Sequence, residues 1–406
     1  MKKNKIINAQ KIEFFNSLGN YFLESLWDEY YSGSVWQDVV FQAYDFNVEM
    51  GFSRRESWMS IYRNVIPIYK GMSFNPLTRE LKENKYSARE IVGADLEELL
   101  KASFVFFERF KNKKIGVQLS GGLDSSIIIG LLKYFKIPHA LIGLKSKRFE
   151  FRTECTIQDL LADSAHDVCF IDEETVLPYS MLTSCVPHQV PNISNLDILQ
   201  DITMANAAKN LGVDVLLSGG GGDNLFGSPV AHQSENRLYT PQLFCNDFLV
   251  DCVYASKGIS YVSFFSDPKI IDVISSLRSG QDEDLNKIWA RQFFKDYLPR
   301  ELVDFSFKAD FWGRYIDGVT SNYSSIKKVC RMAYELSGDS FFSAERVSGL
   351  LSADLLVPNK KLYSQIEALT SSAVWVVSSL NTHLHKDHSS NGLSILDTLL
   401  YSPNET

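Results

Sequence analysis

Between residues 115 and 218, short apolar segments alternate with helix-like segments, and few folds accommodate this alternation. The predicted strands are Ile115–Ser120, His139–Leu144, Asp167–Ile171 and Val213–Ser218. The predicted helices are Ser126–Phe135, Glu154–Ala165 and Asp197–Leu211, with a further helix in residues 89–110 and a mostly helical region over 236–380. Strands that alternate with helices form a parallel sheet with helices on both faces. We therefore expect an α/β fold with a doubly wound parallel sheet, in which ligands bind beyond the carboxyl ends of the strands.

A glycine-rich turn, LSGGLDSS, follows the first predicted strand. Gly121 and Gly122 let the backbone approach an anion, and the following helix start supplies unpaired N–H groups. The lysine of a Walker A loop is absent, and the glycine spacing differs from the dinucleotide fingerprint. Asp124 would repel phosphate unless a cation lay between them, which points to Mg²⁺. The alternative is an aspartate that only caps the helix. The serine hydroxyls of this turn are further candidate ligands for phosphate: Ser120, Ser125 and Ser126.

A second glycine-rich turn, LLSGGGGDNLFG, follows the last predicted strand. We expect Asp223 to face Asp124 across the strand ends, because two carboxylates that converge on one cation form a common magnesium arrangement. Ser218 and Gly219 lie at the start of this turn and are predicted to contact the nucleotide. By itself, this turn could also be a flexible loop with a capping aspartate.

These turns resemble those of one enzyme superfamily. SGGLDSS is similar to the signature of pyrophosphate-loop ATPases, and the second turn resembles the SGxGxDExFGGY motif of asparagine synthetases. The residues that match the second motif are Ser218, Gly219, Gly221, Asp223, Phe226 and Gly227. The resemblance implies the fold of the pyrophosphate-loop ATPases. It also implies an ATP- and Mg²⁺-dependent ligase that adenylates a carboxylate, releases pyrophosphate and transfers the acyl group to an amine.

Two departures from the asparagine-synthetase motif indicate which group within the superfamily the sequence resembles most. The residue three before Asp223 is glutamate in asparagine synthetases, tyrosine in β-lactam synthetases and often histidine in lasso-peptide cyclases. Here it is Gly220, which has no side chain for proton transfer. The usual FGGY continuation is replaced by FGSP at residues 226–229. Lasso-peptide cyclases also tend to lose the GGY residues, so the pattern is closest to theirs.

Lys308 is the predicted catalytic residue. It lies in the segment YLPRELVDFSFKADFWGRY, which resembles the LPxELxxRxKxxF region of the family. An ammonium there would offset charge on the α-phosphate and on the oxyanion of acyl transfer. The alternative is a solvated surface lysine, but the aromatic neighbours Phe307 and Phe311 favour a shielded one.

The N-terminal region resembles only the end of a glutaminase domain. The similarity covers ESWMSIYRNVIPIYKGMSFN. Asparagine synthetases begin with Met-Cys, and that cysteine hydrolyses glutamine. In this sequence position 2 is Lys2, and the first cysteine is Cys155. Glutamine is therefore not expected to donate the nitrogen. We predict an N-terminal region over 1–88, a synthetase domain over 89–382 and a polar tail over 383–406.

Charge and composition exclude other classes of protein. The net charge of -8 argues against nucleic acid as a partner, because binding phosphates needs a positive field. The sequence has neither an apolar run long enough for a membrane span nor a signal h-region. Its six cysteines include no CxxC pair, which is typical of reduced thiols in the cytoplasm.

The leading hypothesis is lasso-peptide macrolactam cyclisation, with a precursor peptide as substrate and a leader-binding protein and leader peptidase as partners. One alternative is an asparagine-synthetase-like or β-lactam-synthetase-like ligase that joins a small carboxylate to ammonia or an amine. A non-catalytic nucleotide- or peptide-binding protein is disfavoured by Asp124, Asp223 and Lys308. An enzyme that modifies tRNA or nucleotides shares the first turn but is disfavoured by the second.

Overall fold

The structure, a computed structural model, describes part of the chain. The described residues are 7–8, 72–75, 80–83, 91, 94–163, 165–182, 196–226, 250–251, 253–278, 287–304 and 312–337, with isolated positions between 348 and 377. The predicted polar tail lies outside them, as does Lys308.

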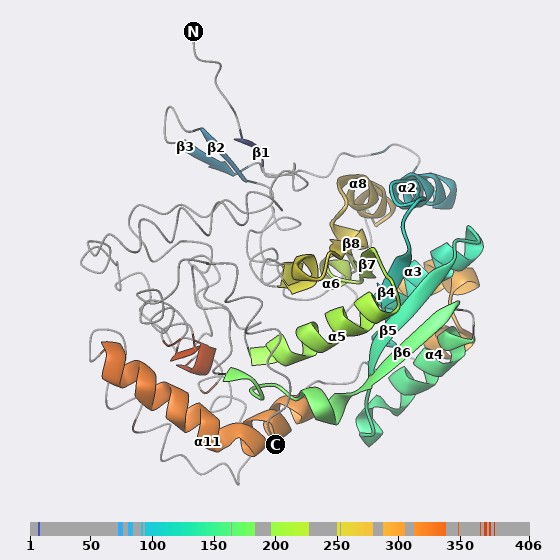
Figure 1. The fold of residues 1–406 in the computed structure, drawn as a ribbon. Coiled ribbons are helices and arrows are strands. Elements are labelled where there is room, and N and C mark those ends of the chain that lie inside the picture. Colours follow the sequence, from blue (N-terminus) through green and yellow to red (C-terminus); the bar gives the residue numbers. More distant parts are fainter. Residues whose placement is uncertain are drawn as a thin grey trace.

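A five-stranded parallel sheet forms the centre of the synthetase region (Figure 1). Its strands are β4 (Ile115–Gln118), β5 (His139–Lys145), β6 (Asp167–Asp172), β7 (Val215–Ser218) and β8 (Ser260–Ser263). Their spatial order is β6-β5-β4-β7-β8, so the chain reverses its direction of growth between β4 and β7. Such a switch point opens a crevice at the carboxyl edge of the sheet, where doubly wound proteins bind their ligands. The two glycine-rich turns follow these two strands.

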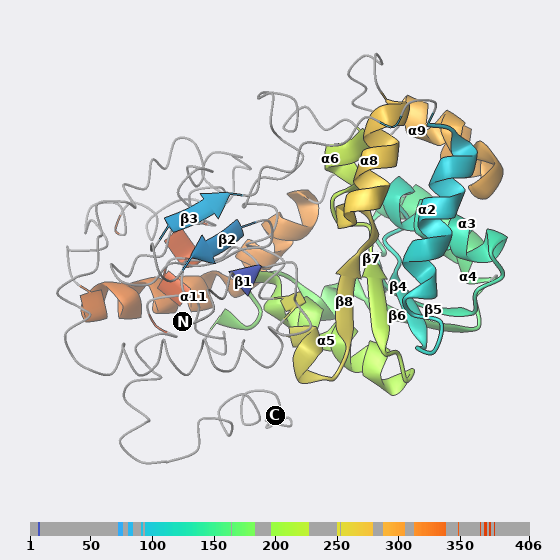
Figure 2. The ribbon, with the colours of Figure 1, turned by 90° about the horizontal axis from the view of Figure 1, so that it is seen from above.

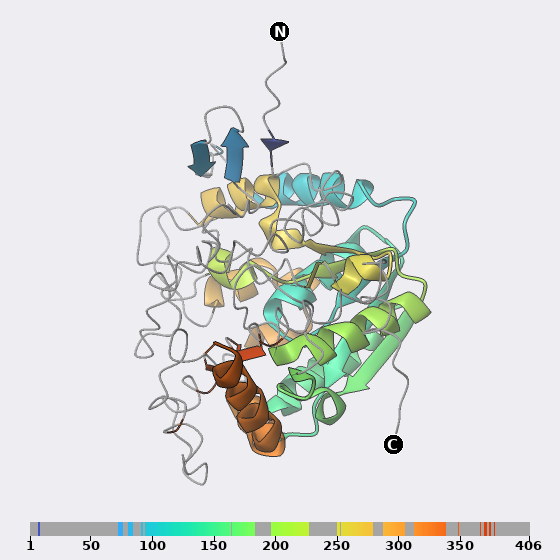
Figure 3. The same ribbon diagram turned by 60° about the vertical axis from the view of Figure 1, so that its left-hand side comes forward.

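Helices cover both faces of the sheet, which confirms the doubly wound fold (Figure 2). On one face lie α2 (Leu96–Glu108), α3 (Leu123–Tyr134), α4 (Arg152–Ala162) and α8 (Pro268–Leu277). On the other lie α5 (Ile198–Asn210) and α11 (Trp312–Ser337). Figure 3 shows α11 and α5 close together on that second face. Each face is apolar because strand residues alternate between them: Val117 packs toward α3, whereas Ile142 and Leu216 pack toward α5.

Shorter elements complete the described part. They are the 3₁₀ turns η3 (Phe149–Phe151), η4 (Glu173–Val176), η7 (Phe264–Ser266) and η8 (Lys295–Tyr297), and the helices α6 (Gly222–Phe226), α9 (Ile288–Phe293) and α10 (Arg300–Asp304). A separate antiparallel sheet joins β1 (Ile7–Asn8), β2 (Met72–Asn75) and β3 (Glu80–Glu83). Thus the MSFN end of the segment that resembles a glutaminase domain forms a strand.

Two features differ from the sequence predictions. Helix α3 begins at Leu123 instead of Ser126, because the hydroxyls of Ser125 and Ser126 donate to the Gly122 carbonyl and close the first turn. The region 236–380, predicted as mostly helical, also contains β8. Its sequence SYVS is short and half polar, so helical periodicity around it conceals the strand. None of the helices in the described ranges is long and apolar enough to cross a bilayer.

Candidate active site

The first turn is shaped by its own glycines and serines. Gly121 has φ +79°, and a Cβ on it would lie 2.3 Å from the Glu154 carbonyl oxygen, so only glycine fits. The Ser120 hydroxyl accepts a hydrogen bond from the Gly122 amide at 3.1 Å. The Ser126 hydroxyl donates to the Gly122 carbonyl at 2.7 Å and is fully buried. In this structure the serine hydroxyls therefore bond within the turn and hold its backbone open toward the switch point.

The second turn lies directly against the first. A Cβ on Gly222 would meet the Asp124 carboxyl carbon at 2.4 Å, and one on Gly219 would meet the Asp124 Cβ at 3.0 Å. Gly221 has φ +82°, which side chains rarely adopt. Only glycines let the two turns approach this closely, and their approach brings Asp124 beside α6, which carries Asp223.

Lys287 joins the two carboxylates. Its Nζ lies 2.7 Å from both oxygens of Asp124 and 2.7 Å from Oδ1 of Asp223. The Lys287 side chain is only 10 % exposed, and its backbone is left-handed, with φ 54°. Its ammonium also lies 5.7 Å from the centre of the Phe226 ring. Sequence reasoning missed this lysine, since no local motif distinguishes it from a surface lysine.

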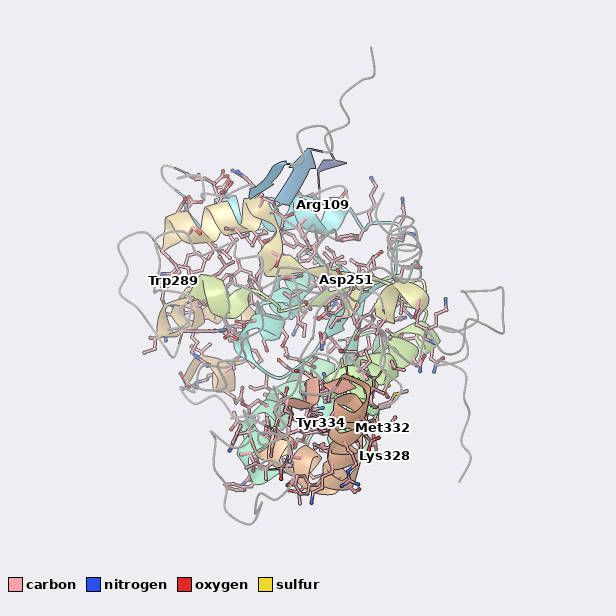
Figure 4. The ribbon with its side chains drawn as sticks, turned by 90° about the vertical axis from the view of Figure 1, so that its left-hand side faces the viewer. Arg109, Asp251, Trp289, Lys328, Met332 and Tyr334 are labelled. Carbon is pink, nitrogen blue, oxygen red and sulfur yellow. The ribbon has the colours of Figure 1, made fainter. Side chains whose placement is uncertain are left out.

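Aromatic side chains form a cluster next to Lys287. Trp289, in the first turn of α9, lies near α6 (Figure 4), and its ring centre is 6.3 Å from that of Phe226. Trp289 also stacks on Phe293 at 4.9 Å. Phe226, Trp289 and Phe293 thus form an aromatic cluster, and its member Phe226 lies beside the Lys287 ammonium.

The carboxylate pair suits a divalent cation. In the structure, Asp124 and Asp223 hold the positive end of Lys287, so their oxygens converge where a cation is favourable. Magnesium is bound through one or two carboxylates plus substrate phosphates and water. Within the described residues, no group of three or more acidic, histidine or cysteine side chains could hold a metal. Asp124 and Asp223 therefore fit a magnesium ion that takes its remaining ligands from phosphate.

The sequence model of the asparagine synthase family matches residues 110–257, a range that contains both turns. This region belongs to the asparagine-synthetase superfamily. The chain therefore contains an ATP-dependent amide-forming ligase domain, that is, a carbon–nitrogen ligase of asparagine-synthetase type. No curated protein matches the chain. Lys287 and Lys308 lie beyond the matched range.

A buried ionic network anchors α11 to the synthetase domain. Arg314 Nη1 donates to Asp197 at 3.0 Å, its Nη2 donates to the Val176 carbonyl at 2.8 Å, and its Nε lies 3.4 Å from Glu173. The Tyr315 hydroxyl donates to the other Asp197 oxygen at 2.6 Å. Arg314 and Glu173 are both buried, so removing either one would leave the charge of the other buried without its partner. The network joins the start of α11 to η4 and to the start of α5.

Asp201, one turn into α5, is the most strongly perturbed acid described in the synthetase domain. Burial raises its pKa to about 7, with help from the negative charge of Asp197 and against the attraction of Arg314. It lies on the apolar face of α5, in the series Ile198, Asp201, Ala205. A polar residue at a core-facing position of a predicted helix can be recognised in the sequence, but Asp201 is not among the predicted site residues.

Asp201→Asn should stabilise the synthetase domain above neutral pH. The pKa of Asp201 is raised from 3.8 to about 7, so folding retains a proton that the unfolded chain has released. The unfolding free energy of wild type should therefore fall as pH rises between about 4 and 7, by at most roughly 4 kcal/mol. The asparagine side chain of the variant does not titrate, so its unfolding free energy should not fall in this way. Urea denaturation at pH 4.5 and pH 8 measures the difference, and a variant no more stable than wild type at pH 8 contradicts it.

Lys287→Met should make the stability of the domain depend more strongly on magnesium. Without the ammonium, Asp124 and Asp223 repel each other, and a bound divalent cation then replaces the lost charge. The melting temperature should fall without magnesium and recover as millimolar magnesium is added. Lys114→Met is the matched control, because it breaks the exposed Lys114–Asp167 pair at the opposite edge of the sheet. The same magnesium response in wild type and both variants would argue against a cation site.

Proposed function

We propose that this protein is a macrolactam synthetase that closes a ring on a precursor peptide. It adenylates the side-chain carboxylate of an Asp or Glu in the peptide with ATP, and pyrophosphate leaves. The peptide's own α-amine then attacks the acyl-adenylate and displaces AMP. The adenylating reaction is what the resemblance of both turns to the asparagine-synthetase superfamily implies.

The observation that carries the peptide assignment is Gly220. Its backbone is not in the left-handed region, and the atoms nearest to a Cβ there would be the hydroxyls of Ser218 at 3.3 Å and Ser263 at 3.6 Å and the Ser263 Cβ at 3.9 Å. The turn therefore does not demand glycine here, in contrast to Gly221 and Gly222. Without a side chain at this place, ammonia, which is mostly ammonium at neutral pH, lacks the acidic side chain that asparagine synthetases carry there. An α-amine has an ordinary pKa of about 7.7–8.0, so an appreciable fraction is already neutral.

In this proposal, residues of both turns contact the magnesium ion and the nucleotide. Asp124 and Asp223 hold Mg²⁺, which offsets the negative charge of the phosphates when it is bound. Lys287 and Lys308 offer ammonium groups to the phosphates and to the oxyanion of acyl transfer. The groups that contact the nucleotide are Ser120, Gly121, Gly122, Ser125, Ser126, Ser218 and Gly219. A leader-binding protein and a leader peptidase are the partners that such a reaction requires.

The choice of nucleophile tests the proposal. Genes for a short precursor peptide, a leader-binding protein and a peptidase should lie beside this one. Amide formation on that precursor should exceed amide formation from ammonia at neutral pH. Gly220→Glu restores the acidic side chain of asparagine synthetases and should shift the preference toward ammonia. If wild type uses ammonia better than the peptide amine, a ligase for a small carboxylate replaces the macrolactam assignment.

A further inference from the structure

Asp201 lies at the carboxyl edge of the sheet. Helix α5 ends at Asn210 and leads into the amino end of β7 within a few residues, so its first turn lies at the opposite edge. That edge carries both glycine-rich turns. Asp201 is only 7 % exposed, and its carboxyl receives no hydrogen bond from the described residues that would lower its pKa. Native proteins rarely bury such a group without a partner, and those that do mostly use it for function.

Tyr254 is a second buried polar group in the same place. Its side chain is fully buried, and its hydroxyl has no hydrogen-bond partner in the structure. The negative charge of Asp201 contributes to the raised pKa of Tyr254, so the two groups are electrostatic neighbours. The Arg314 guanidinium also binds Asp197 and the Val176 carbonyl and lies near Glu173, so its attraction only partly offsets the burial of the Asp201 carboxyl. A carboxyl and a hydroxyl that form no hydrogen bond with the described residues suit a ligand that carries a cationic N–H donor.

Contacts on this face connect the surroundings of Asp201, namely Tyr254 and Met204, with the two glycine-rich turns. Tyr254 stacks on Tyr261 at 4.8 Å, and the Tyr261 hydroxyl donates to Gln118 at 2.8 Å. Gln118 ends β4, directly before the first turn, and its amide lies 3.7 Å from the sulfur of Met204, one helical turn after Asp201. Tyr261 lies two residues before Ser263, whose hydroxyl donates to the Gly220 carbonyl at 2.5 Å. These groups all lie on the α5 face of the sheet, whereas Asp124 opens α3 on the other face.

We propose that Asp201 binds the attacking amine of the substrate and accepts the proton that the amine releases as the amide forms. This inference rests on the proposed function. It assigns the proton acceptor that Gly220, which has no side chain, does not provide. The amine nitrogen forms the new C–N bond while the acyl C–O bond breaks, and the electron pair of that bond leaves with AMP. The proton lost from nitrogen passes to an Asp201 oxygen.

The surroundings suit this role. A general base works best when its pKa lies near the operating pH, and burial raises the pKa of Asp201 to about 7. The charged and titratable groups that act on it are Asp197 on its own helix, Arg314 from α11 and Tyr254, with Glu173 of η4 behind Arg314. An ammonium that enters beside Asp201 also supplies the positive charge that the site lacks.

Asp201→Asn separates this role from a structural one. The carboxylate probes are the α-methylamides of N-acetyl-aspartate and N-acetyl-glutamate, and the amine probes are glycinamide and hydroxylamine. Exchange of labelled pyrophosphate into ATP reports adenylation alone and should stay within about twofold of wild type. Coupling to glycinamide at pH 7 should fall by ~10²–10⁴-fold. Hydroxylamine is largely unprotonated at neutral pH, so its coupling should fall far less.

Asp163→Asn, at the exposed end of α4, is the control and should leave all three reactions unchanged. Because Asp201→Asn should also stabilise the fold above pH 7, lower glycinamide coupling in a more stable protein supports the inference. Equal losses in exchange and in both couplings, or unchanged glycinamide coupling, would overturn it. If wild type shows no exchange with either carboxylate probe, the proposed function itself fails, and this inference fails with it.

Discussion

Asp124→Asn and Asp223→Asn should each abolish amide formation while the protein stays folded. In the proposed site, each change removes one of the two carboxylates that face a single cation, and both carboxylates contact Lys287 at 2.7 Å. Losing one oxygen ligand should cost several kcal/mol of charge stabilisation in the transition state. That cost corresponds to a fall in turnover of ~10³-fold or more. Turnover at saturating ATP and magnesium measures it.

Asp304→Asn is the matched control, because it removes an aspartate from an exposed pair with Arg300. Its turnover should equal that of wild type. Circular dichroism should show that all three variants are folded. If either Asp124→Asn or Asp223→Asn retains near-normal turnover at saturating magnesium, that residue does not hold the ion.

Lys308→Ala should reduce the chemical steps far more than ATP binding. Its proposed role is to offset charge that develops during adenylation and acyl transfer, so its loss affects the transition state more than the ground state. Removing one such electrostatic contact typically costs ~10²–10³-fold in turnover. Lys308→Arg should fail nearly as badly, since a planar guanidinium does not replace a compact ammonium.

The comparison for Lys308 is Lys295→Ala, an exposed lysine next to α9. Steady-state kinetics should give a nearly unchanged KM for ATP in Lys308→Ala with a much lower kcat. A raised KM with an unchanged kcat would instead show that Lys308 serves binding alone.

The sheet could be predicted from the sequence because its central strands are buried on both faces. IGVQ, HALIGL and VLLS read as continuous apolar runs, and each is followed or preceded by a clear helix. The edge strand β8 has no such run, since SYVS has serines at both ends. Its place depends on pairing with β7, which is a long-range contact that local periodicity does not record.

Only those parts of the site that lie within a short sequence motif could be predicted from the sequence. The turns that contain Asp124 and Asp223 carry their own glycine patterns, so both aspartates could be singled out. Lys287 reaches them from a segment 64 residues beyond Asp223, and its importance lies in tertiary contact. Asp201 did have a local signal, an aspartate spaced with the apolar residues Ile198, Met204 and Ala205 of its helix. Its significance depends on neighbours from α11 and from the segment before β8, which only the fold brings together.

The products formed from ATP show whether the enzyme adenylates its carboxylate substrate. A turn that holds the terminal phosphates and leaves the α-phosphorus open to a carboxylate should release AMP and pyrophosphate in equal amounts with each amide formed. Chromatography of the nucleotides after turnover, with pyrophosphate measured in the same sample, gives the answer. We expect AMP and pyrophosphate, and ADP with inorganic phosphate as the main products would contradict adenylation of the carboxylate.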